Sequence, residues 1–183
     1  MSRLMFMAGA AVAILAGVTA PAARATDADP CTGFKWDVSR ELAVMRQAPQ
    51  AITAARKPGA NLAQIKVGTL YALQLAAQAA VTFVTSPAKS HPSDGATADL
   101  VRLRVDQAGR YRVSITSGHW VDIVDGGVLL KSLGFQGHTG CERPRKIVEF
   151  DLAADRGLIL QLSGATDAEV GMAVTAVSAA AAN

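Results

Sequence analysis

The sequence lacks the short motifs that mark nucleotide-dependent enzymes and serine hydrolases. It contains no phosphate-binding loop, no dinucleotide fingerprint and no Gly-x-Ser-x-Gly turn. It also contains no internal repeat of about 20–50 residues. Any chemistry therefore has to come from residues that are scattered along the chain.

A surplus of charge of one sign is also missing once the N-terminus is set aside. The whole chain has net charge +3, but two of its 18 basic residues, Arg3 and Arg24, lie within residues 1–25, which hold no acidic residue. The other 158 residues carry 16 basic and 15 acidic side chains. Proteins that bind nucleic acid concentrate positive charge, so this balance argues against a nucleic-acid partner. Disorder is excluded as well, because half of the chain is apolar.

Residues 1–25 have the three parts of a secretory signal peptide. Arg3 supplies the positive start, residues 4–18 form an apolar run, and residues 23–25 (Ala-Arg-Ala) provide the small side chains that signal peptidase requires. The run is shorter than the roughly 20 residues that span a bilayer, and no later segment is apolar enough to cross one. We expect a periplasmic or secreted protein, with no stable membrane insertion after cleavage.

Cysteine is scarce, and its pattern agrees with export. The chain has only Cys31 and Cys141. Two cysteines so far apart do not resemble a Cys-x-x-Cys redox pair or a zinc site. In an oxidising compartment an even count favours a disulfide, so we expect a Cys31–Cys141 bond, with two free thiols as the alternative.

One domain is expected over residues 26–177, followed by a disordered tail at 178–183. A short helix is predicted over residues 38–47, because apolar side chains recur there at helical spacing. Asp37 is placed to accept hydrogen bonds from the first turn, and Pro49 follows where the helix should end.

From about residue 64 the apolar pattern takes the period of two that is typical of strands. A polar loop is expected at residues 86–98. The expected strands are 67–75, 81–85, 101–106, 111–116, 119–124, 128–131, 148–152, 158–162 and 170–177. About eight or nine short strands between residues 64 and 177 predict a mainly β protein, an antiparallel β-sandwich of the jelly-roll type with one short N-terminal α-helix.

Four of these strands are predicted to form two hairpins. In the first, Val105 would lie opposite Tyr111, with Gly109 supplying a positive φ in the turn. In the second, residues 148–152 would pair with residues 158–162, with a glycine at the equivalent place. Each hairpin would present one uniformly apolar face.

Residues 99–177 resemble the β-sandwich modules of secreted bacterial proteins called pre-peptidase C-terminal domains. The shared features are an amphipathic strand that ends in Ala-Gly-Arg-Tyr at 108–111 and an Asp-containing strand at 121–126. A second glycine-turned pair of strands and a valine-rich closing strand follow. The resemblance implies an accessory, non-catalytic module that assists adhesion, substrate contact or stability.

Three histidines are the candidates for metal chemistry. His91 lies in the polar loop, and the carboxylates near His119 and His138 in the sequence are those of Asp122 and Glu142. Two histidines and a carboxylate would suit a divalent metal such as iron or zinc, although no closely spaced histidine pair occurs. The alternative is that each histidine is solvated or bonds locally. Ser117 is spaced too close to His119 for the pair to act on each other as in a serine hydrolase.

Short exported chains of this kind also resemble proteins labelled homogentisate 1,2-dioxygenase. The true enzyme is a much longer cupin with a His-His-Glu iron site, and no such spaced motif occurs here. The resemblance nevertheless implies an alternative function, a small metal-dependent oxygenase.

The first predicted hairpin carries a stripe of arginines. Its register would set Arg104 opposite Arg112, with Arg102 on the same outer face. Directly opposed like charges destabilise a sheet unless something neutralises them. Either Glu149 and its strand neutralise the stripe from the side, or an anionic ligand binds across the three arginines.

The glycine-rich segment 134–140 is the other candidate recognition surface; it carries Phe135 and His138, precedes Cys141 and is expected to lie near Trp120. The alternative is that it is only a connection. Together these patterns predict an exported binding or structural module without catalytic activity or a required cofactor. Its partner would be a small anion, a glycan or a protein of the cell envelope.

Overall fold

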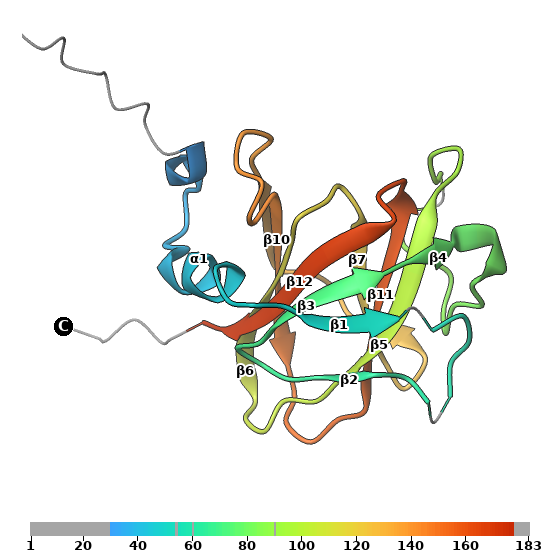
Figure 1. Ribbon diagram of the computed structural model, residues 1–183. Coiled ribbons are helices and arrows are strands. Elements are labelled where there is room, and N and C mark those ends of the chain that lie inside the picture. The colour runs from blue at the N-terminus through green and yellow to red at the C-terminus, as the bar shows by residue number, and fades with distance from the viewer. Residues whose placement is uncertain (1–29, 54, 60, 90, 178–183) are drawn as a thin grey trace, which may run out of the picture.

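The computed structural model describes residues 30–53, 55–59, 61–89 and 91–177. The predicted signal peptide and the C-terminal tail lie outside these residues. The described chain is mainly β, and two six-stranded sheets make up most of it (Figure 1). The predicted β-sandwich is therefore confirmed.

Sheet I carries a helix on its outer face. Its strands lie in the order β1 (Gln50–Thr53), β3 (Leu70–Gln74), β12 (Glu169–Ala176), β6 (Gly109–Ile115), β10 (Lys146–Leu152) and β9 (Gly134–Gly137). All neighbours are antiparallel except β1 and β3, which are parallel.

Sheet II packs against the inner face of sheet I. Its strands lie in the order β2 (Gln64–Ile65), β5 (Thr97–Leu103), β11 (Leu158–Ala165), β7 (Trp120–Asp125) and β8 (Val128–Leu129), and β4 (Ala76–Ala77) pairs with β5. The edge strand β2 is parallel to β5. The core between the sheets consists of the inward-facing apolar side chains of both, and Phe150 is its largest fully buried member.

Both predicted hairpins are wrong, although their strands exist. β5 belongs to sheet II and pairs with β11, whereas β6 belongs to sheet I and pairs with β10 and β12. The strands β10 and β11 are likewise divided between the sheets. Two strands with apolar inner faces bury those faces equally well as neighbours in one sheet or in opposite sheets that face each other across a core about 10 Å thick. Alternation therefore cannot distinguish a hairpin from a connection between sheets.

The turn geometry reflects this difference. Among the described residues, positive φ angles occur at Asp155 (φ 55°) and at five glycines, but Gly109 and Gly157 are not among them. A two-residue hairpin turn needs positive φ, whereas these longer connections span from one sheet to the other.

The predicted helix is confirmed as α1 (Ser39–Met45), and Asp37 Oδ1 accepts a hydrogen bond from the Ser39 amide at 3.0 Å. Short 3₁₀ turns lie at η1 (Pro30–Gly33) and η2 (Gln78–Ala80). No helix in the described residues is long and apolar enough to cross a membrane.

Two local predictions are wrong. Residues 81–85 are not a strand; the side chain of Gln161 accepts from the amide of Val84 at 2.9 Å and donates to the carbonyl of Thr85 at 3.0 Å. The segment expected to be a glycine-rich loop begins with β9, because Phe135 pairs with Val148 at the edge of sheet I.

The predicted disulfide is confirmed. Cys31 in η1 is bonded to Cys141, 110 residues later, in the connection between β9 and β10. Cys141 is fully buried. The bond thus fixes the N-terminal segment to a loop beside the outer face of sheet I.

Candidate functional site

The predicted arginine stripe does not form. Arg102 lies in β5 of sheet II and Arg104 directly follows that strand, whereas Arg112 lies in sheet I. Arg102 donates to the carbonyl of Gly59 at 3.0 Å, and Arg104 forms an exposed ion pair with Asp155 at 2.6 Å. The three guanidinium groups therefore share no surface on which one anion could bind.

Arg112 is neutralised within the protein. It is paired in register with Glu149 of β10, and its Nε donates to Glu149 Oε2 at 2.9 Å. Its Nη1 donates to the carbonyl of Asp37 at 2.7 Å and lies 3.7 Å from Glu41 Oε2, while the guanidinium stacks 4.6 Å from the Trp36 ring. The prediction that Glu149 compensates the charge is confirmed for this arginine. The cluster fastens α1 and the preceding segment to sheet I.

His119 is a buried residue with local partners. Ser117 Oγ lies 2.8 Å from Nδ1, and Thr97 Oγ1 lies 3.0 Å from Nε2. The spacing of two residues therefore does allow Ser117 to contact His119, contrary to the reason given above for excluding a serine hydrolase. Thr97 donates its proton to the carbonyl of Asp167 at 2.6 Å, which leaves Nε2–H as the donor to Thr97 and Nδ1 as the acceptor from Ser117. Desolvation lowers the pKa of His119. Both side chains of the Ser117–His119 pair are almost fully buried, which suits a structural role.

The other candidate metal ligands lie apart from this network. His138 follows β9 and packs near the ring of Phe34 at 6.1 Å, and Glu142 is exposed. Within the described residues, no three His, Cys, Asp or Glu side chains gather closely enough to hold a metal ion. Phe135 and Trp120 line a common hollow of about 20 Å³, which is too small for a ligand.

Helix α1 covers only part of the outer face of sheet I. The side chains of this face form rows across the neighbouring strands β3, β12 and β6. One row contains Leu70, Ala173 and Ser114, and α1 covers it with Val44 and Met45. Because α1 has only seven residues, it ends before the next row.

That next row consists of small side chains. Ala72 is paired with Gly171, and Gly171 lies beside Thr116. The amide of Gly171 donates to Thr116 Oγ1 at 2.8 Å, and the amide of Thr116 donates to the carbonyl of Gly171 at 3.0 Å. The row leaves space above the sheet that α1 does not fill.

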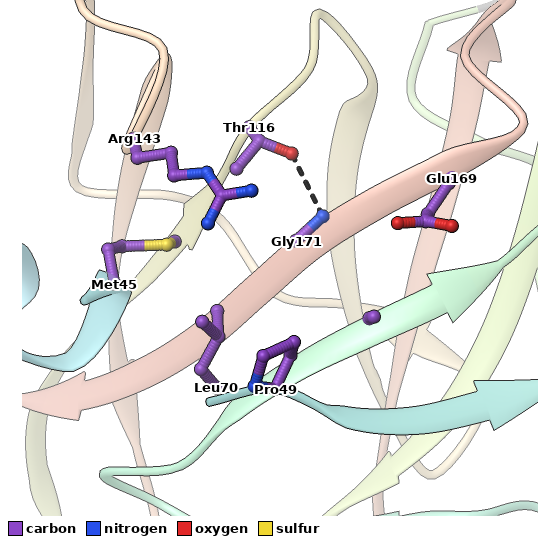
Figure 2. A pocket seen from close by; sticks show the side chains of 8 residues that line it. Met45, Pro49, Leu70, Thr116, Arg143, Glu169 and Gly171 are labelled. Atoms are coloured by element: carbon purple, nitrogen blue, oxygen red, sulfur yellow. Dashed lines mark hydrogen bonds between the residues drawn. The ribbon is translucent and has the colours of Figure 1, made fainter. Parts of the chain in front are cut away.

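This space is a pocket of about 200 Å³. Small residues form its floor, and charged side chains stand on opposite sides of Gly171 (Figure 2). The lining residues are Met45, Pro49, Leu70, Ala72, Thr116, Arg143, Glu169 and Gly171. We refer to it below as the α1–β12 pocket.

Arg143 enters the α1–β12 pocket from the connection between β9 and β10. Two residues before it, Cys141 is held by the disulfide, and two residues after it, the amide of Arg145 donates to the carbonyl of Ile115 at 2.9 Å. The backbone of Arg143 is thus fixed on both sides. Its guanidinium has no hydrogen bond or ion pair to any residue that the structure describes.

Glu169 supplies the opposite charge at the start of β12. It is paired in register with Gln74, whose side-chain amide donates to Glu169 Oε2. In the described part of the chain, Glu169 Oε1 has no partner. The pocket therefore offers one cation, one half-occupied carboxylate and apolar walls.

Neither Arg143 nor Glu169 was predicted from the sequence. The small residues at 171 and 173 alternate with apolar ones in β12, and this alternation could have indicated a thinly covered outer face. No local signal places Arg143 above that face, because a loop anchored by a distant cysteine brings it there.

Comparisons with protein-family models and with curated proteins find no match to this chain. The two resemblances stated from the sequence therefore stay predictions. The geometry of the α1–β12 pocket has to support any functional conclusion by itself.

Proposed function

We propose that the protein is an exported, non-catalytic β-sandwich module that binds a small carboxylate in the α1–β12 pocket. The observation that carries this proposal is the guanidinium of Arg143, which stands over an apolar-walled pocket without a partner in the described chain. Among the described residues, Arg104, Arg112 and Arg156 have acidic partners, whereas the exposed Arg143 and Arg145 have none. Of these two unpaired arginines, only Arg143 lines the α1–β12 pocket.

A guanidinium binds carboxylates through charge-assisted, often bidentate hydrogen bonds. The apolar side chains of Met45, Leu70 and Pro49 line part of the pocket, and we expect them to contact a hydrocarbon part of the ligand. Pockets for drug-sized ligands hold roughly 300–1,000 Å³, so a pocket of about 200 Å³ favours a ligand of few atoms over a glycan chain. A small anion was one of the partners expected from the sequence, although through other arginines.

The probe for this proposal is a series of simple carboxylates from acetate to hexanoate, titrated into the isotope-labelled protein and followed by amide chemical shifts. We expect saturable shifts at residues 70–72, 116 and 171, with pentanoate binding more tightly than acetate. Loss of a hydrogen-bonded charge partner costs about 1.5–3 kcal/mol, so Arg143→Gln should weaken binding about tenfold or more.

Arg145→Gln is the matched control, because Arg145 is exposed in the same connection and does not line the pocket. It should leave pentanoate binding unchanged. If no carboxylate produces saturable shifts at the pocket, or if Arg143→Gln binds as well as the original protein, the proposal is wrong.

A further inference from the structure

We infer that the ligand of the α1–β12 pocket carries an ammonium group as well as a carboxylate, with a short apolar chain between them. This inference rests on the proposed function and adds the ligand class. It starts from the two charges of the pocket, Arg143 and Glu169, which stand on opposite sides of Gly171 (Figure 2).

The two charges do not satisfy each other. Within the described residues, neither Arg143 nor Glu169 takes part in an ion pair. Gln74 occupies only Oε2 of the glutamate and fixes the orientation of the carboxylate, so that Oε1 is left to accept from a ligand. An ammonium group has three donors and no acceptor, which matches a carboxylate oxygen of this kind.

The pair of charges also discriminates between ligand classes. A simple carboxylate bound to Arg143 would be repelled by Glu169, and a simple amine bound to Glu169 would be repelled by Arg143. A ligand with both groups turns each repulsion into an attraction, which is how specificity arises from unfavourable as well as favourable contacts.

The floor between the charges fits a hydrocarbon chain. It is formed by Ala72 and Gly171, which carry no polar side chain, with Leu70 beside them. Thr116 Oγ1 accepts from the Gly171 amide, and its own proton has no acceptor in the described part of the chain. That hydroxyl is therefore able to donate to a ligand in the pocket. Because the charges come from opposite walls, amino and carboxyl groups at the two ends of a chain fit better than groups on one carbon.

The test compares three probes of matched length: pentanoate, 5-aminopentanoate and pentylamine. We expect 5-aminopentanoate to bind at least fivefold more tightly than pentanoate, and pentylamine to bind more weakly than either. Glycine, with both charges on one carbon, should bind more weakly than 5-aminopentanoate.

Glu169→Gln should abolish the preference for 5-aminopentanoate and make pentanoate bind more tightly than before, because the repulsion from the Glu169 carboxylate is removed. The variant keeps an acceptor for Gln74, so the strand pairing is preserved. Asp106→Asn, which removes one exposed carboxylate outside the pocket, is the matched control and should retain the preference. Arg143→Gln should weaken the binding of both carboxylates.

The outcomes separate the two proposals. If pentanoate binds and Arg143→Gln weakens it, but 5-aminopentanoate binds no better, the carboxylate site stands and the inference about the ammonium group is wrong. If pentylamine binds as well as 5-aminopentanoate, the inference is also wrong. If none of the probes binds, both proposals fail.

Discussion

Gly171 lies so close to the side chain of Thr116 that no residue with a Cβ atom would fit at position 171 without a shift. The Gly171 amide donates to Thr116 Oγ1 at 2.8 Å, and a Cβ atom added at Gly171 would stand 2.8 Å from Thr116 Cγ2. Gly171→Ala should therefore displace the Thr116 side chain and lower the free energy of unfolding by about 1–3 kcal/mol. Urea denaturation measures this change, and pentanoate binding should weaken in parallel because the floor of the pocket is disturbed.

Gly157→Ala provides the comparison for this substitution. Gly157 is exposed, its φ is not positive, and a Cβ atom there would meet nothing within 4 Å. Its effect should stay within about 0.5 kcal/mol. An equal effect of both substitutions would show that the contact with Thr116 is unimportant.

Arg112→Met tests the buried charge cluster beneath α1. It would leave the buried carboxylate of Glu41 without a cation and that of Glu149 with only the half-exposed Arg110, 3.6 Å away. Breaking a buried pair in this way costs about 3–5 kcal/mol, and the thermal midpoint should fall accordingly. Arg104→Met removes the exposed pair with Asp155 and should cost less than about 1 kcal/mol. If the two variants lose similar amounts of stability, the prediction that the buried ion pairs of Arg112 matter more than the exposed pair of Arg104 is wrong.

Asp99 should make the stability depend on pH. Its side chain is buried, Oδ1 accepts from the amides of Ala55 and Leu100, and burial raises its pKa from 3.8 to about 6. A carboxyl whose pKa is raised by folding stabilises the folded state below pH 4, and this contribution is lost as pH rises through about 6. Asp99→Asn keeps an acceptor but does not ionise. Relative to the original protein, it should gain about 2–3 kcal/mol in free energy of unfolding between pH 4 and pH 7.5.

Chemical denaturation at the two pH values measures that gain. Asp94→Asn is the control for removal of a carboxylate from the surface, since Asp94 is exposed. If Asp99→Asn and Asp94→Asn change in the same way with pH, burial of Asp99 has no part in the effect.

The disulfide should support both stability and binding. In the chain-entropy model, a bond that closes a loop of 110 residues contributes nearly 5 kcal/mol. The double substitution of Cys31 and Cys141 by Ser should lower the thermal midpoint. It should also weaken pentanoate binding, because the segment that carries Arg143 loses an anchor. Dithiothreitol should reproduce both effects in the original protein and change nothing in the double variant. If pentanoate binding is unchanged after reduction, the disulfide is not needed to hold Arg143 at the pocket.

The general architecture could be predicted from the sequence, but the pairing of its strands could not. The helix at 38–47 was recognisable because its apolar spacing and Asp37 are local features, and the Cys31–Cys141 bond followed from the even cysteine count. The alternation in 101–106 and 111–116 specified which side chains point inward, and these do form the core. It did not specify whether the strands lie side by side or face each other across that core.

The α1–β12 pocket was beyond prediction for a related reason. Ala72, Thr116 and Gly171 are ordinary small residues in the sequence, and only the strand order brings them into one row. Arg143 has no distinctive neighbours that would set it apart from the exposed Arg145. Conversely, Arg112 looked like part of a binding surface because its partners Glu149 and Glu41 are far from it in the sequence.

The position of β12 in sheet I determines when the floor of the pocket can form during folding. It lies between β3 and β6, so without it the sheet consists of two separate pieces, β1 with β3 and β6 with β10 and β9. The floor of the pocket crosses this seam, because Ala72 belongs to one piece and Thr116 follows the other. Gly171 joins them only when the final strand of the domain is inserted. A shortened chain that ends before residue 169 would lack Gly171, so Ala72 and Thr116 would not be joined into one floor. Ligand binding would therefore show that β12 has been inserted between β3 and β6.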